Sequence, residues 1–99
     1  MSLLDRVFRR PSATHAEAAA AGHAGVWVYH RAGCPFCLRL TLSLGRRASR
    51  ARWIDIWADT DAAAYVRSVN DGNETVPTVV VDGVAHTNPP PAEVRAALA

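Results

Sequence analysis

The fold is decided by the stretch Val26-Trp27-Val28-Tyr29-His30-Arg31-Ala32-Gly33-Cys34-Pro35-Phe36-Cys37. Its first four residues are a short β-type run, and Gly33 closes the loop that follows it. Pro35 is favoured in the first turn of a helix, where its missing N–H is not needed. The stretch therefore predicts a strand, a short loop and a helix, with Cys34 at or beside the helix N-cap.

The position of Cys34 has a chemical consequence. The unpaired N–H groups and the dipole of a helix N-terminus favour a thiolate there, and Arg31 adds positive charge three residues earlier. Cys37 lies one turn further into the helix, close enough to form a disulfide and less exposed. We therefore expect Cys34 to be the attacking thiol and Cys37 the resolving thiol in thiol–disulfide exchange.

Strand and helix signals alternate after this stretch. The helix that Pro35 opens carries Leu38, Leu40, Leu42 and Leu44 and has Gly45 as a plausible stop. Trp53–Trp57 reads as a second strand, with Ile54 and Ile56 on one face and both tryptophans on the other. Asp59 or Thr60 can cap a helix that runs to Val69, and the turn from Asn70 to Asn73 ends it.

The last third of the chain predicts a hairpin and a helix. Asp82-Gly83 separates Thr78–Val81 from Val84–His86, and Asp-Gly between two apolar runs favours a two-residue turn. Ala92–Leu98 reads as a terminal helix after three prolines. The order β-α-β-α-β-β-α predicts an α/β fold with a mixed four-stranded sheet, helices on both faces and a parallel, right-handed β-α-β unit in its first half.

Residues 1–25 read as an N-terminal helical extension to a domain of residues 26–99. Leu3, Leu4, Val7 and Phe8 share one helical face, Pro11 and Ser12 interrupt that helix, and His15–Ala21 is alanine-rich enough for another turn or two. No chemistry is evident in this segment.

Composition limits the function. The chain has 99 residues, a net charge of +2 and two cysteines. So small a charge, carried by scattered arginines, does not indicate nucleic-acid binding. No signal peptide and no bilayer-spanning apolar run is apparent, so we expect a cytoplasmic protein that does not engage a membrane. A close cysteine pair in a reducing compartment is more often catalytic or metal-binding than structural.

Two interpretations of the cysteine pair other than redox chemistry remain. Cys-x-x-Cys supplies half of a tetrahedral zinc site, but no second pair follows and His23, His30 and His86 lack ligand spacing. Buried, inert cysteines are the other reading, against which the intervening proline and the strand-loop-helix context argue. We therefore expect no metal site.

Thr75-Val76-Pro77-Thr78 precedes the hairpin and is the second element of interest. Pro77 suits the start of a strand, where a missing N–H is tolerated. A cis Val76–Pro77 bond would expose the Val76 backbone to an extended substrate beside Cys34, whereas a trans bond would make Pro77 a simple strand-initiating residue.

The combination of Val28–Cys37 with Thr75-Val76-Pro77-Thr78 resembles the glutaredoxin family, and the likeness extends from Val26 to Leu98. It implies a thioredoxin-like fold of the glutaredoxin type, Cys34 as nucleophile and Pro77 in cis. Arg31 stands where glutaredoxins often carry a lysine that helps to bind the carboxylate of the small thiol. The expected substrate-binding residues are Arg31, Pro35, Phe36, Thr75, Val76 and Pro77.

One segment departs from the glutathione-using members. These usually have Gly-Gly and an acidic residue after the last strand, where this chain has His86-Thr87-Asn88-Pro89-Pro90. Ser68–Thr78, with Thr87-Asn88-Pro89 and Glu93-Val94 downstream, is similar to the mycoredoxins of actinobacteria. Those proteins reduce mixed disulfides between proteins and mycothiol by a monothiol mechanism, although they often have Cys-Gly-Tyr-Cys instead of Cys-Pro-Phe-Cys.

The leading hypothesis is therefore an enzyme that reduces protein–small-thiol mixed disulfides, with mycothiol preferred to glutathione as co-substrate and no tightly bound cofactor. One alternative is a thioredoxin-like electron donor that uses both cysteines and is reduced by a flavoprotein disulfide reductase. A third, non-enzymatic alternative is an iron–sulfur cluster carrier, which a proline after the nucleophile disfavours.

Overall fold

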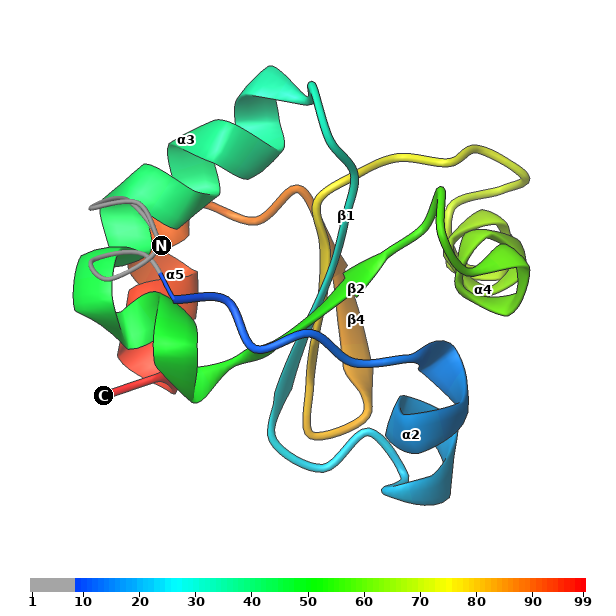
Figure 1. Cartoon of the computed structure of the whole chain (residues 1–99), viewed down its shortest axis with the longest axis horizontal. Coiled ribbons are helices and arrows are strands. Elements are labelled where there is room, and N and C mark those ends of the chain that lie inside the picture. Colours follow the sequence, from blue (N-terminus) through cyan, green and yellow to red (C-terminus); the bar gives the residue numbers. More distant parts are fainter. Residues whose placement is uncertain (1–8) are drawn as a thin grey trace.

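A four-stranded mixed sheet forms the centre of the molecule in the computed structural model, which describes residues 9–99. The strand order is β2-β1-β3-β4 (Figure 1). Strand β1 (Val26–His30) pairs in parallel with β2 (Arg52–Asp55) and antiparallel with β3 (Thr78–Val81), which pairs antiparallel with β4 (Val84–Thr87). The predicted mixed sheet is confirmed.

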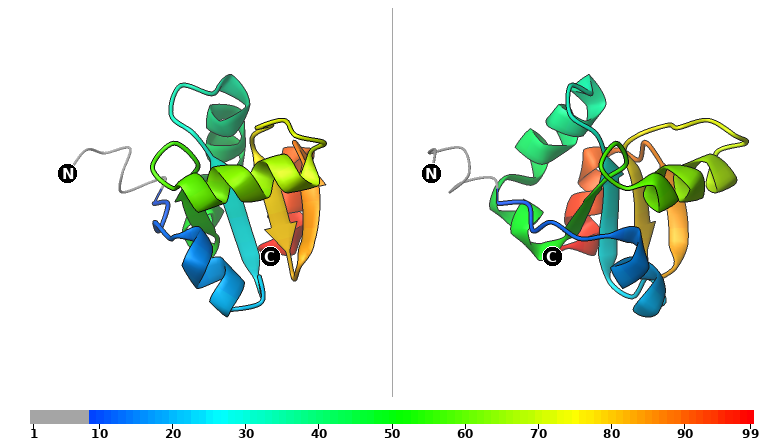
Figure 2. Two further views of the ribbon diagram at one scale, coloured as in Figure 1. Left: turned by 90° about the vertical axis from the view of Figure 1, so that its right-hand side faces the viewer. Right: turned by 45° about the vertical axis from the view of Figure 1, so that its right-hand side comes forward.

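Helices cover both faces of the sheet, as predicted for a thioredoxin-like fold (Figure 2). Helices α3 (Pro35–Leu44) and α5 (Pro91–Ala97) lie on one face, and α2 (His15–Ala20) and α4 (Thr60–Val69) lie on the other. Two separate clusters of buried side chains correspond to the two faces.

The central strand β1 serves both clusters. Trp27 and Tyr29 pack toward α2 and α4, whereas Val26 and Val28 pack toward α3 and α5. Alternate residues of a strand point to opposite faces, so a strand between two helical layers is apolar throughout. The fixed position of β1 is what orients the loop that leads to Cys34.

The hairpin β3–β4 turns at Asp82-Gly83, as the sequence predicts. Both residues have positive φ, 46° and 89° respectively. The Asp82 carboxylate also accepts the Gly25 N–H at 2.8 Å, so this turn is tied to the residue that precedes β1.

Strand β2 ends earlier than predicted. It stops at Asp55, whose carboxylate accepts the Trp57 N–H at 2.9 Å and so turns the chain. The expectation that Trp53 and Trp57 share a strand face is therefore wrong. Trp53 is buried, and its indole N–H donates to the Ala48 carbonyl at 2.8 Å, whereas Trp57 lies beyond the strand and is 64% exposed.

A short 3₁₀-helix, η1 (Gly45–Arg50), follows α3 and was not predicted. Gly45 ends α3 with φ 55°, which a residue without a Cβ adopts readily. The extra turn carries the Ala48 carbonyl that anchors Trp53.

Residues 9–25 lie against the sheet. Ser12 forms a parallel bridge with Trp53, where Ala13 N–H donates to the Trp53 carbonyl and Trp53 N–H donates to the Pro11 carbonyl, both at 2.8 Å. Helix α2 falls within the alanine-rich segment expected to be helical. The helix expected over Ser2–Phe8 lies outside the described residues.

Helix α2 is fixed by hydrogen bonds to the elements beneath it. His15 Nδ1 and the Nε2 of His23, which follows α2, each lie 2.8 Å from the Tyr29 hydroxyl, and the His15 N–H donates to Asp59 at 2.8 Å. Within residues 9–99, no helix combines the length and apolar character that crossing a bilayer requires.

Candidate redox site

Cys34 is the N-cap residue of α3, as the sequence predicts. Its φ and ψ are −85° and 117°, Pro35 occupies the first helical turn, and the Cys34 carbonyl accepts the Leu38 N–H at 3.0 Å. The residue is only 5% exposed. The strand-loop-helix connection thus holds the sulfur where the free N–H groups of the helix converge.

Opposing effects act on the Cys34 thiol. Burial raises its pKa, but the N–H groups of Cys37 and Phe36, the Cys37 thiol and the Arg31 charge all stabilise the thiolate. The net pKa lies below the usual value for cysteine. The Cys34 thiol therefore ionises more readily than an ordinary cysteine.

Cys37 behaves in the opposite way. Burial and, to a smaller extent, the neighbouring Cys34 sulfur raise its pKa to about 12, although hydrogen bonding by the Arg31 backbone and the Arg31 charge oppose both effects. The residue is 2% exposed, and both cysteines are free thiols in this structure. One helical turn thus contains a thiol that ionises readily and a thiol that resists ionisation.

Arg31 is held by a residue that the sequence analysis left outside the site. Its guanidinium carbon lies 5.1 Å from the centroid of the Trp57 ring, within the range of a cation–π contact. Trp57 reaches this position because the chain turns after Asp55. Only the pairing of β1 with β2 could have indicated this contact, because it brings the ends of the two strands together.

The Thr75–Pro77 segment lies beside the thiol, as expected. The Val76–Pro77 peptide is cis, in agreement with what the resemblance implies. The Cys34 thiol donates to the Val76 carbonyl with 3.7 Å between sulfur and oxygen. Val76 and Pro77 are both buried, and the Thr75 carbonyl accepts the Thr78 hydroxyl at 2.7 Å.

Asn70 connects this segment to the end of β4. Its amide donates to the Val66 carbonyl at 2.8 Å and to the Thr78 hydroxyl at 3.1 Å, and its oxygen accepts the Thr87 hydroxyl. Asn88 N–H donates to the Pro77 carbonyl at 2.8 Å. Thr87 and Asn88, at the end of β4 and just after it, therefore stabilise the Thr75–Pro77 loop through these hydrogen bonds.

An open groove of about 440 Å³ leads to Cys34. The residues that line it include Arg31, Gly33 and Pro35 near the sulfur, and Leu38 and Arg10 further out. Phe36 is half-exposed on the first turn of α3. Arg10 was not predicted, because nothing in its local sequence shows that residues 9–14 run beside β2.

His30 is the last residue of β1, before the loop that leads to Cys34. Its ring meets the Trp53 ring edge-on at 5.4 Å between centroids. Burial and the nearby Arg10 charge lower its pKa to about 4, although Asp55 acts in the opposite direction. The imidazole is therefore neutral at physiological pH.

The side chains near the cysteine pair offer little to a metal ion. Across residues 9–99 no three side chains of His, Cys, Asp or Glu converge on one point. A structural zinc needs four such ligands.

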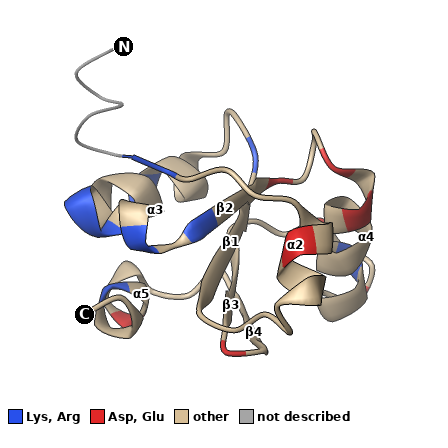
Figure 3. Cartoon of the chain, turned by 60° about the horizontal axis from the view of Figure 1, so that its bottom comes forward, with Lys and Arg blue, Asp and Glu red and all other residues tan. Residues whose placement is uncertain are grey.

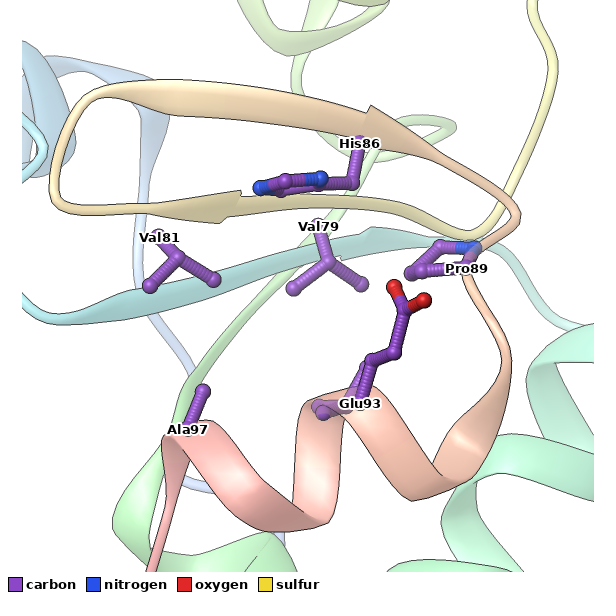
Figure 4. A pocket seen from close by; sticks show the side chains of 7 residues that line it. Val79, Val81, His86, Pro89, Glu93 and Ala97 are labelled. Atoms are coloured by element: carbon purple, nitrogen blue, oxygen red, sulfur yellow. The ribbon is translucent and has the colours of Figure 1, made fainter.

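A second cavity, of about 150 Å³, lies between the β3–β4 hairpin and α5 (Figure 4). Its lining is mostly apolar, with His86 above Val79 and with Glu93 reaching toward Pro89. It contains neither cysteine, so it is separate from the thiol site.

Comparison with known proteins agrees with this geometry. The family model described as glutaredoxin matches residues 26–86. Mycoredoxin 1 of Corynebacterium glutamicum is 43% identical over 72 residues, which cover 72% of this chain and 89% of that protein. A Mycobacterium tuberculosis protein whose name assigns it provisionally to the glutaredoxins is 42% identical over 76 residues, which cover 76% of this chain and 90% of that protein. The chain belongs to the glutaredoxin family and is a thiol–disulfide oxidoreductase.

Proposed function

We propose that this protein reduces mixed disulfides between proteins and a small thiol, with Cys34 as nucleophile and mycothiol as the preferred small thiol. The observation that carries the proposal is the placement of Cys34 at the N-cap of α3, with its sulfur 3.7 Å from the Val76 carbonyl oxygen and with Cys37 buried one turn further into the helix. The directions in which the pKa values of the two thiols shift agree with it, lowered for Cys34 and raised for Cys37. A single reactive thiolate suits a monothiol mechanism.

The reaction balances with the small thiol as reductant. The Cys34 thiolate attacks the small-thiol sulfur of the mixed disulfide, a new S–S bond forms to Cys34, and the protein thiolate leaves and takes up a proton. A second small-thiol molecule, as its thiolate, then attacks the adduct and leaves as the oxidised small-thiol disulfide, which regenerates the Cys34 thiolate.

The backbone of Val76, beside the Cys34 sulfur, suits the binding of the small-thiol half of the adduct. Val76 lies against the Cys34 sulfur, so an adduct on Cys34 extends along the Thr75–Pro77 backbone. Pro35 and Phe36 form the exposed opposite rim at the start of α3. In this proposal Arg31 stabilises the thiolate and contacts the bound small thiol.

Three observations favour mycothiol. Residues 86–90 replace the Gly-Gly-acidic segment typical of glutathione users. One relative is named mycoredoxin 1. Trp57 presents an exposed indole beside Arg31, and such a ring offers an apolar face to the sugar unit of mycothiol.

A dithiol route is a second candidate, favoured by the position of Cys37 one helical turn beyond Cys34. In this route Cys37 loses its proton and attacks the Cys34 adduct, which releases the small thiol and leaves a Cys34–Cys37 disulfide. A flavoprotein disulfide reductase would then supply two electrons. We place either reaction in the cytoplasm, where such thiols stay reduced.

The test is a steady-state assay on a mycothiolated model peptide, with mycothiol or glutathione as reductant. We expect Cys34→Ser to lose all activity, Cys37→Ser to retain a large part of it, and mycothiol to give the higher turnover. Full loss in Cys37→Ser would overturn the monothiol mechanism, and higher turnover with glutathione would overturn the choice of small thiol.

A further inference from the structure

Arg10 adds a second guanidinium to the groove at Cys34, and it comes from outside residues 26–86, which match the glutaredoxin family. The backbone next to it is fixed, because Pro11 and Ala13 hydrogen-bond to Trp53 of β2. Arg10 is therefore part of the ordered wall of the groove.

The side chain of Arg10 is held as well. Its guanidinium carbon lies 5.5 Å from the centroid of the Trp53 ring, and Nη1 donates to the Thr41 hydroxyl at 3.4 Å. Trp53 is itself anchored to Ala48, and Thr41 donates to the Cys37 carbonyl at 2.9 Å. Binding to a guanidinium that is already oriented costs less side-chain entropy.

Within residues 9–99, neither guanidinium of the groove forms an ion pair with a carboxylate. The two ion pairs found among residues 9–99 are Arg52–Glu17 and Arg67–Glu74. None of these four residues lines the groove. Figure 3 shows the same separation at larger scale, with basic residues gathered along α3, η1 and β2 and acidic residues on α2 and α4. The groove therefore attracts anionic groups.

Different residues flank Cys34 on its two sides. Strand β1 leads to Cys34 and lies between β2 and β3. Arg10 lies over Trp53 of β2, whereas Val76 is followed by Pro77 and then by β3. If the small thiol lies along Val76, as in the proposed function, the leaving protein half extends toward Arg10.

We propose that Arg10 is a specificity-determining residue that binds a carboxylate of the substrate protein, next to the cysteine that carries the small thiol. The inference rests on the proposed function. Leu38, 57% exposed on the same groove, provides an apolar contact beside that carboxylate. The preferred partner is thus a polypeptide segment with an acidic residue close to its modified cysteine.

The test uses two peptides that carry the same small thiol on cysteine and differ only in flanking Glu or Gln. The rate constant for small-thiol removal is measured for each at low and high salt. Wild type should favour the Glu peptide by about 1.4-fold to fivefold, the range of an exposed ion pair, and this preference should shrink at high salt. Arg10→Gln should abolish it, whereas Arg47→Gln, which removes an equally exposed charge elsewhere, should leave it intact.

Charge reversal gives a readout that misfolding cannot imitate. Arg10→Glu should favour a third peptide with flanking Lys over the Glu peptide. The inference would be overturned if Arg10→Gln lowered the rate constant equally for all peptides. It would also be overturned if the decrease depended on which small thiol the peptide carries and not on the flanking residue. Failure of the wild type to act on any of the peptides would contradict the proposed function itself.

Discussion

The guanidinium carbon of Arg31 lies 5.1 Å from the centroid of the Trp57 ring. This contact joins the loop after β1 to the turn after β2, and it keeps a positive charge near the Cys34 sulfur. Arg31 is one of the groups that lower the pKa of Cys34. Trp57, which is far from Cys34 in the sequence, thus contacts a charged residue that lowers the pKa of Cys34.

Removal of the Arg31 charge should raise the pKa of Cys34. Because a cation stabilises the thiolate, Arg31→Gln should shift ionisation of Cys34 to higher pH. Thiolate absorbance against pH, measured in a Cys37→Ser background, checks the shift. Arg31→Lys keeps the charge and serves as the control; a thiolate titration that is identical in Arg31→Gln and wild type would contradict the assigned role.

The two cysteines should differ sharply in their rates of alkylation in the folded protein. Burial is the main cause that raises the pKa of Cys37 to about 12, so at pH 8 it remains a thiol, whereas the lowered pKa of Cys34 favours its thiolate. Iodoacetamide should label Cys34 first and Cys37 only after unfolding in urea. Both cysteines lie between Arg31 and Arg39, so fragmentation of one tryptic peptide identifies the labelled site. Equal labelling of the folded protein would show that the predicted difference is absent.

Loss of the Trp57 indole should raise the KM for mycothiol more than the KM for glutathione. Trp57→Ala removes the exposed indole and should raise the KM for mycothiol about twofold to tenfold, the range of one aromatic contact, while kcat changes less. Trp57→Phe retains an aromatic face and should recover part of the loss. Val84→Ala truncates another exposed apolar residue, on β4, and is the control. A parallel rise in KM for both thiols would remove the sugar-binding role.

Asp59 should link stability to pH. Its carboxylate caps α4 through the Ala62 N–H at 3.1 Å and accepts the His15 N–H at 2.8 Å. Asp59→Ala should lower the free energy of unfolding by about 1 to 2 kcal/mol at pH 7, as expected for loss of an N-cap. Urea denaturation of both proteins measures the difference, with Asp61→Ala as a milder variant in the same turn.

The pH dependence of this effect has a definite sign. Burial raises the pKa of Asp59, but the N–H groups of His15, Ala62 and Asp61 outweigh it, so the folded pKa is lowered. The charge-dependent part of the stabilisation is thus complete above the unfolded pKa, near 3.9, and is lost as the pH falls through the folded pKa. The gap between wild type and Asp59→Ala should narrow in acid, and a gap that widens would contradict this sign.

The sequence by itself determined the features that depend on neighbouring residues. The run from Val26 to Cys37 specified a strand, a loop and a helix with Cys34 at its N-cap, because cap position and proline placement are local. Asp82-Gly83 specified its hairpin turn because positive φ is a property of those two residues. Elements, turns and the cysteine pair could therefore be predicted without knowledge of the whole fold.

Only the tertiary structure decided which distant residues meet at Cys34. Trp57 was expected to extend β2 but turns away after Asp55, and Arg10 enters the groove because residues 11–13 pair with Trp53. Such contacts depend on strand order and on packing across the sheet, which local patterns do not encode. The place of Cys34 at a helix N-terminus was thus predictable from the local sequence, whereas its surroundings were set by how the sheet brings β2, β1 and β3 together.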